Sequence, residues 1–169
     1  MRLSALFSTL VGDLPSAKST KPLLQLKPNT PVCAFIEKGH VIEYIEVGPE
    51  RKRVVALFFG PREFAVHCNL QFSNFQALDK GTINPFTHGQ IIRMLRKFPE
   101  SRQLYTELRK VYQQKVADRI RTLTTMTGPE RFAHLKNQQP WVFKLAKMED
   151  IASYLAMPVS MVKTLQQGV

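Results

Sequence analysis

The chain has 169 residues, with 24 Lys and Arg against 13 Asp and Glu, and its formal net charge is +11. Its hydrophobic fraction of 44% is ordinary for a folded protein and excludes wholesale disorder. A chain of this length builds one good core, or one mid-sized domain and a small one. The basic excess favours an acidic partner, either nucleic acid or an acidic membrane surface.

Several other classes of protein are disfavoured by what the chain lacks. Its two cysteines, Cys33 and Cys68, are too few for a disulfide framework or an all-cysteine zinc site. No apolar run approaches the length of about 18 residues that a membrane span needs, and we expect no signal peptide. The scattered histidines, with His67-Cys68 as the nearest approach to a metal pair, predict no metal site, and no nucleophile elbow or phosphate loop is present. We therefore expect a cytoplasmic protein that is not an enzyme, carries no cofactor and does not bind a membrane.

The first hundred residues read as a β domain with helices at its ends. Apolar residues at helical spacing predict an amphipathic opening helix at residues 1–11, and the turn-rich stretch that follows has room for one short strand at residues 23–26. Short runs rich in Val, Ile, Tyr and Phe then predict a meander of strands, typical of a sandwich or barrel. A helical pattern at residues 88–98 ends this part. The predicted strands are residues 32–36, 41–47, 54–59, 75–78 and 82–83.

The longest helical pattern covers residues 99–126. No Gly or Pro lies inside it, so about 27 residues can form one helix roughly 40 Å long. One apolar stripe runs along an otherwise charged surface. Such a helix either packs on its own domain or connects two parts and joins two chains, and its length and position favour the second interpretation. The predicted dimer interface is Leu104, Leu108, Val111, Tyr112, Val116, Ile120 and Leu123.

The last part of the chain reads as a set of short helices. Thr127 and Glu130 are spaced as a capping box, which predicts a helix that begins there and ends before Pro140. Residues 148–166 then have the pattern of a helix-turn-helix, with small Ala152 at the helix crossing and Pro158 opening the second helix. Helix pairs of this kind also occur as plain packing units, so the pattern alone leaves both interpretations open.

The order of these parts resembles the Crp/Fnr family of bacterial transcription regulators from about Leu23 onward. Residues 35–44 resemble a stretch of the family's cyclic-nucleotide-binding-type β domain, residues 77–79 the strand before its last helices, and residues 151–155 a helix of its short members. The resemblance implies an α+β fold with an N-terminal double-stranded β-helix (jelly-roll) sensor domain, a long dimerisation helix and a small C-terminal helix-turn-helix domain. It implies as partners double-stranded DNA, a second copy of the chain, RNA polymerase and an unidentified small-molecule effector. The implied domains are residues 1–100, 101–126 and 127–169.

The resemblance also implies a ligand cup, from which this sequence departs. Family members that bind cyclic AMP hold the ribose with a Gly-Glu pair and the phosphate with an Arg that a small hydroxyl residue follows. Here Gln71 falls where the Arg would be, and a neutral amide cannot replace a bidentate charged grip. Arg62 could supply a charge, although it reads as a surface turn residue. We expect no cyclic AMP binding, and the cup is either empty or holds another ligand. The candidate ligand-binding residues are Gly60, Arg62, Glu63, Gln71, Phe72 and Ser73.

A second departure lies in the predicted recognition helix. Family members that read DNA strongly place Arg, Glu and Arg at the positions of Val159, Ser160 and Thr164. Here Lys163 is the only cation of the helix, so we expect docking on phosphates with weak reading of bases. The alternative is a non-DNA-binding sensor or interaction module with a degenerate helix-turn-helix. A basic face around Lys144, Lys147 and Lys163 on both subunits of the dimer would favour DNA binding over this alternative. The candidate DNA-binding residues are Lys147, Ser160, Met161, Lys163 and Thr164.

Overall fold

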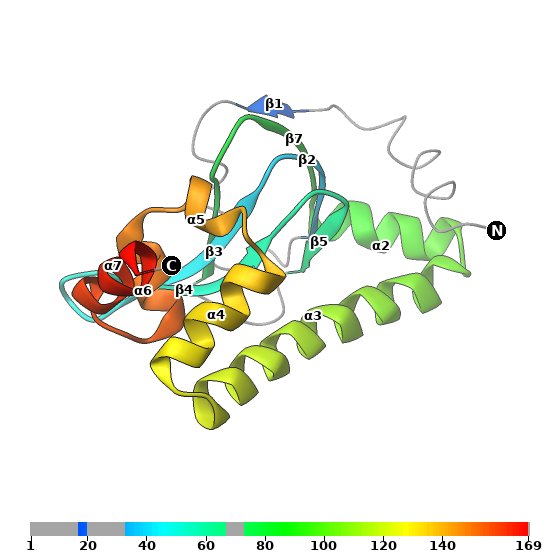
Figure 1. Ribbon diagram of the computed structural model, residues 1–169. Coiled ribbons are helices and arrows are strands. Elements are labelled where there is room, and N and C mark those ends of the chain that lie inside the picture. The colour runs from blue at the N-terminus through cyan, green and yellow to red at the C-terminus, as the bar shows by residue number, and fades with distance from the viewer. Residues whose placement is uncertain (1–16, 20–32, 67–72, 169) are drawn as a thin grey trace.

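The computed structural model describes residues 17–19, 33–66 and 73–168. Within these ranges the chain is an α+β protein with two small antiparallel sheets and a set of helices (Figure 1). The predicted opening helix at residues 1–11 and the strand at residues 23–26 lie outside the described residues. The strands are β1 (Ala17–Ser19), β2 (Cys33–Lys38), β3 (Val41–Val47), β4 (Lys52–Phe59), β5 (Glu63–Val66), β6 (Ser73–Ala77) and β7 (Gly81–Phe86). The helices are α2 (His88–Lys97), α3 (Ser101–Thr125), α4 (Gly128–Gln138), α5 (Val142–Leu145), α6 (Met148–Leu155) and α7 (Val159–Gln167).

The strands alternate between the two sheets along the chain. One sheet has the order β1-β7-β2-β5 and the other β4-β3-β6. Five of the predicted strands are confirmed as β2, β3, β4, β6 and β7, whereas β1 and β5 were not predicted. The predicted meander is wrong, because among the described strands only β3 and β4 pair as neighbours in the sequence. Residue periodicity reports a strand's two faces and says nothing about which strand lies beside it.

The chain passes from one sheet to the other at the corner between β2 and β3. Gly39 has a φ of 92°, a left-handed conformation that favours glycine. Gly81 lies against this corner, and a Cβ on it would be 2.1 Å from the carbonyl oxygen of Lys38. The His40 N–H donates to Asp79 Oδ1 at 2.7 Å, and the His40 ring Nδ1 lies 2.8 Å from Asp79 Oδ2. The corner is therefore fixed by two glycines and one carboxylate.

The first of two cores lies between the sheets and extends to the helices. Ile36 and Ile83 enter it from one sheet and Phe59 from the other, all at most 5% exposed. The long helix α3 adds Leu104 and Tyr112, which pack on the β domain of their own chain. Burial of this apolar surface supplies the main driving force for assembling the sandwich and its covering helices.

The second core lies on the opposite face of β3 and β4, against the C-terminal helices. Neighbouring residues in a strand point to opposite faces, so Val41 enters the first core while Ile42 enters the second. Phe58 packs there with Ile151 of α6 and Val162 of α7, each at most 2% exposed. Figure 1 shows α4 to α7 gathered at the β3–β4 end of the molecule. This core spans the predicted domain boundary at residue 127.

Helix α6 covers an edge of the β3-containing sheet. Strand β4 is an edge strand, and such an edge leaves backbone groups unpaired unless another element covers it. The Val55 N–H donates to the Ser153 hydroxyl at 3.0 Å. Arg53 pairs through Nε with Asp150 Oδ1 at 2.9 Å and lies 3.8 Å over the ring of Tyr44. Polar contacts as well as the second core thus join α6 to the sheet.

The predicted helices are largely confirmed. The long pattern at residues 99–126 becomes α3, and the pattern at residues 88–98 becomes α2. The capping box is confirmed at the start of α4, where the Glu130 carboxylate accepts a hydrogen bond from the Thr127 N–H at 2.7 Å. The Thr127 hydroxyl also donates to this carboxylate at 2.7 Å, and the two hydrogen bonds hold the pKa of Glu130 below its usual value. The short helix α5 was not predicted, because a single turn after Pro140 gives no periodic signal.

Candidate functional site

Helices α6 and α7 form a tightly connected pair at the end of the chain. Ala156 ends α6 in the left-handed conformation, with a φ of 50°. The Met157 N–H donates to the Ala152 carbonyl at 3.1 Å, which closes the end of α6, and Pro158 is the N-cap of α7. Val162 anchors α7 in the second core and is fully buried. One side of α7 is thereby fixed and the other side faces outward.

Arg131 of α4 holds the turn between these helices. Its Nε donates to the Leu155 carbonyl at 2.8 Å and its Nη2 to the Ala156 carbonyl at 3.3 Å. Its Nη1 donates to the Met126 carbonyl at 2.8 Å, at the end of α3. Sequence reasoning missed this residue, because its role depends on the α3–α4 turn placing it beside the α6–α7 turn. One guanidinium therefore links the long helix to the terminal helix pair.

The structure brings four of the predicted DNA-binding residues onto the outward side of α7. Ser160, Met161, Lys163 and Thr164 are all exposed. The Thr164 hydroxyl donates to the Ser160 carbonyl at 3.1 Å, one turn earlier. Lys163 is the only charged residue within α7. Lys147, the fifth predicted residue, is exposed at the N-cap of α6, and Lys144 is exposed in α5.

The predicted ligand cup is described only in part, because Gln71 and Phe72 lie outside the described residues. Arg62 is an exposed turn residue with a φ of 67°. The Glu63 carboxylate accepts from the Gly60 N–H at 2.9 Å and from Lys115 Nζ at 2.8 Å. Glu63 thus ties the β4–β5 turn to α3. The assignment of these residues to a ligand stays a prediction.

A buried carboxylate connects β3 with α3 and was missed by sequence reasoning. Glu43 has no solvent-exposed surface, and it accepts a hydrogen bond from the Tyr112 hydroxyl at 3.0 Å. Desolvation by burial raises the pKa of Glu43 to about 7, although hydrogen bonds from Tyr112 and Ser73 act in the opposite direction. The one signal in the sequence is a charged residue within a run of Val, Ile and Tyr. Ser73, a predicted cup residue, is buried beside this carboxylate.

The predicted dimer residues lie on different sides of α3. Leu104 and Tyr112 are buried in the first core, and Leu108 and Val116 pack against it. Leu104 and Tyr112 therefore have little surface left for a second chain. Val111 and Ile120 are each 57% exposed, while Leu123 is half-buried. The dimer interface stays a prediction, and it can be tested by substituting the exposed residues Val111 or Ile120.

Metal-ligand clusters and membrane-spanning helices are both absent from the described ranges. Residues 33–66 and 73–168 place no group of three or more His, Cys, Asp or Glu side chains together in a way that could hold a metal ion. Within the same part of the chain, no helix combines the length and the apolar character needed to cross a membrane.

No protein-family model matches the chain, and no curated protein matches it either. Solved structures do match. FixK2 from Bradyrhizobium japonicum is similar with a TM-score of 0.69 at 12% identity, covering 91% of this chain and 82% of that one. The c-di-GMP-responsive global regulator CLP from Xanthomonas campestris is similar with a TM-score of 0.71 at 9% identity, covering 98% of this chain and 90% of that one. A protein of the Crp/Fnr family from Eubacterium rectale is similar with a TM-score of 0.69 at 11% identity, covering 99% and 83%.

These matches extend over both the β domain and the C-terminal helices. At identities of 9–12% they bear on the fold, which is also the fold that the resemblance in the sequence implied. The α+β architecture, the long helix and the order of the elements agree with it. The chain has the fold of the Crp/Fnr transcription regulators.

Proposed function

We propose that the chain is a DNA-binding transcription regulator that docks the outward side of α7 on double-stranded DNA. The observation that carries the proposal is the α6–α7 pair, whose tight turn buries Val162 and leaves Ser160, Lys163 and Thr164 exposed together. A second helix held this way can enter a major groove. The net charge of +11 supports an acidic polymer as the partner.

The composition of α7 decides what kind of DNA binding this is. Lys163 is its one charged residue, and the chain has no arginine there to make a bidentate contact with guanine. Each good pair of that kind contributes about 1–3 kcal/mol of discrimination between bases. We therefore propose that phosphates supply most of the affinity and that discrimination between sites is modest.

Lys163→Ala is expected to weaken binding to all duplexes alike. It should also flatten the slope of log K against log salt by about one unit per chain, because one phosphate contact is lost. The measurement is a fluorescence anisotropy titration of labelled random and selected duplexes across a salt series. Lys97→Ala is the matched control, since Lys97 is an exposed lysine on α2, which lies far from α7 (Figure 1). An unchanged slope for Lys163→Ala would place the DNA contact elsewhere.

A second copy of the chain completes the proposal. Two α7 helices about 34 Å apart would reach successive major grooves. Two of the predicted interface residues, Val111 and Ile120, are 57% exposed, and Ile120 is the closer of the two to the C-terminal end of α3. Ile120→Glu is expected to give monomers at concentrations where the wild type sediments as a dimer, because an interface would then bury an unpaired charge. Val47→Glu is the control, an exposed valine at the end of β3. A wild type that is already monomeric at micromolar concentration would remove this part of the proposal.

The remaining features of the proposed regulator concern its ligands. We propose that the sensor domain does not bind cyclic AMP and that the chain is not an enzyme, as the sequence predicted. RNA polymerase and a small-molecule effector are the further partners that a regulator of this fold would need.

A non-DNA-binding sensor or interaction module is the second candidate. It is favoured by the single charge of α7 and by the docking of α6 on β4 through Ser153 and Asp150. A degenerate helix pair of this kind would serve as a cover for the sheet edge. If no duplex binds even at low salt, this candidate takes the place of the regulator.

A further inference from the structure

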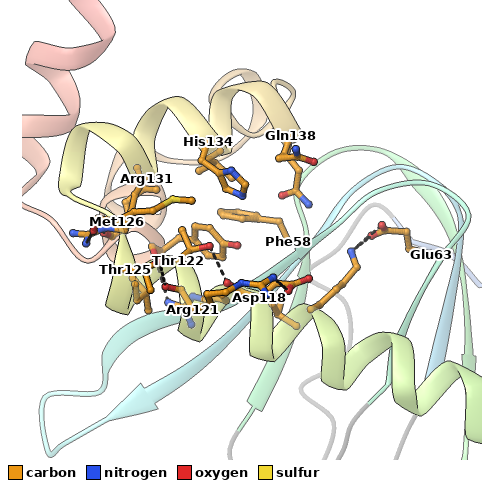
Figure 2. Close-up of a pocket in the computed structure, with 18 residues that line it drawn as sticks. Phe58, Glu63, Asp118, Arg121, Thr122, Thr125, Met126, Arg131, His134 and Gln138 are labelled. Atoms are coloured by element: carbon orange, nitrogen blue, oxygen red, sulfur yellow. Dashed lines mark hydrogen bonds and ion pairs between the residues drawn. The ribbon is translucent and has the colours of Figure 1, made fainter.

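A pocket of about 620 Å³ lies where α3, α4 and α6 meet strand β4. Figure 2 shows His134 and Gln138 of α4 facing Asp118 and Thr122 of α3, with Phe58 between the two helices. The volume falls in the usual range of about 300–1,000 Å³ for small-molecule sites. Of the predicted cup residues that the structure describes, Glu63 alone lines it. The pocket lies on the side of α3 that faces the C-terminal helices.

Its charged lining is basic, and the basic groups differ in how they are paired. Lys115 pairs with Glu63 at 2.8 Å, and Arg121 pairs with Asp118. Arg119 also lines the pocket, but it forms an ion pair with no carboxylate in the described part of the chain. Arg131 also lines the pocket without a carboxylate partner among the described residues, but its Nε, Nη1 and Nη2 all donate to backbone carbonyls.

The guanidinium group of Arg119 is only partly hydrogen-bonded. Its Nη2 reaches the Tyr154 carbonyl at 3.4 Å, a long hydrogen bond. Its Nε is buried and has no hydrogen-bond partner among the described residues. Burial lowers the pKa of Arg119, and the nearby Tyr154 and Glu43 only partly offset this effect. An unpaired buried donor on a charged group is costly.

A complementary acceptor lines the same pocket. Oε1 of Gln139 is also buried without a hydrogen-bond partner in the described residues. The pocket thus combines an unpaired cationic donor with an unpaired neutral acceptor. Polar groups of this kind can fix the orientation of a ligand in a cavity.

Part of the wall of the pocket is aromatic and aliphatic. Phe58 and Tyr154 face each other with ring centroids 4.9 Å apart, and the Arg119 guanidinium lies 4.8 Å over the Tyr154 ring. Leu123 and Leu135 complete this side. Such a wall suits a planar or aliphatic body, because burying it removes apolar surface from water.

We propose that this pocket binds an organic anion of metabolite size, with a phosphate or carboxylate group on Arg119 and an apolar body against Phe58 and Tyr154. A hydrogen-bond donor of the ligand would face Gln139. A guanidinium and an oxyanion form the stronger class of hydrogen bond. The site touches α3, α4 and α6 together, so the bound anion would stabilise their present arrangement. The proposal does not depend on DNA binding.

The test uses 8-anilinonaphthalene-1-sulfonate as the probe, an aromatic sulfonate whose emission rises in apolar surroundings. We expect saturable binding to the full chain at one site. Arg119→Met should weaken it at least about tenfold, since one charged hydrogen bond is lost. Arg109→Met is the matched control, an exposed arginine of the same helix that does not line the pocket. Phenyl phosphate and benzoate, which share one ring, then compete with the probe and show which anionic group is preferred.

A second variant keeps the test decisive if Arg119→Met disturbs the fold. Thr122→Phe leaves Arg119 in place and fills the space between α3 and α4, where Thr122 lines the pocket. It should abolish probe binding while the circular dichroism spectrum stays that of the wild type. Non-saturable binding, or equal binding to the wild type and to Thr122→Phe, would overturn the proposal.

Discussion

Phe58→Ala is expected to lower the free energy of unfolding by about 3–5 kcal/mol, as removal of a fully buried aromatic ring usually does. Phe58 is 2% exposed and lies in the core that joins β3 and β4 to the C-terminal helices. Its ring contacts Trp141 at a centroid distance of 6.0 Å and Tyr154 at 4.9 Å. Both rings belong to the C-terminal helices, so the loss should weaken the packing of these helices on β4.

Trp141 makes the measurement simple, because it is the only tryptophan of the sequence. Denaturant unfolding followed by tryptophan fluorescence reports this junction, and far-ultraviolet circular dichroism reports the whole chain. Because the second core joins the β domain to the C-terminal helices, the two transitions should coincide in the wild type. Phe98→Ala, a half-buried ring after α2, is the control and should cost clearly less. If Phe58→Ala lowers the free energy of unfolding by less than about 1 kcal/mol, Phe58 does not pack in a core that joins the β domain to the C-terminal helices.

Glu43→Gln is expected to stabilise the protein in alkaline solution and to have little effect in acid. Burial raises the pKa of Glu43 from 4.5 to about 7, so the folded state prefers the protonated carboxyl. The stability that this group contributes is fully present below pH 4.5 and is lost as the pH rises through about 7. Above that range the ionised carboxylate costs about 3 kcal/mol, and the neutral amide avoids this cost while it can still accept from Tyr112.

The measurement is the free energy of unfolding of the wild type and the variant from about pH 5 to about pH 9. The two curves should lie close together at the acid end and separate through neutral pH. Glu107→Gln is the control, because Glu107 is an exposed carboxylate on α3 paired only with Lys110 one turn away. Curves for Glu43→Gln and wild type that stay parallel would show that this carboxylate does not titrate as its burial requires.

Local signals in the sequence were sufficient for most of the elements. Short runs rich in Val, Ile, Tyr and Phe located β3 and β4, and an apolar stripe without Gly or Pro located α3. The Thr127 and Glu130 pair located the start of α4, because a capping box depends on residues three positions apart. The helix pair α6 and α7 followed from apolar spacing and Pro158.

What the sequence did not reveal depends on contacts between distant segments. Strands β2 and β3 belong to different sheets, and at the corner between them Gly81 fits closely against the Lys38 carbonyl, a contact between distant positions of the sequence. The apolar stripe of α3 was interpreted as an interface for a second chain, and the sequence did not show that Leu104 and Tyr112 pack on their own domain. The unpaired Nε of Arg119 is likewise visible only when α4 and α6 are placed around it.

The central claim is that the outward side of α7 docks on DNA, and the wild type on duplex DNA tests it most directly. A labelled random duplex and a mixture of genomic fragments are titrated by fluorescence anisotropy at about 50 mM and about 200 mM salt. We expect saturable binding to both DNA samples at the lower salt and a steep loss of affinity at the higher salt. The affinities for the two samples should differ little. Absence of binding to either sample at the lower salt would contradict the central claim.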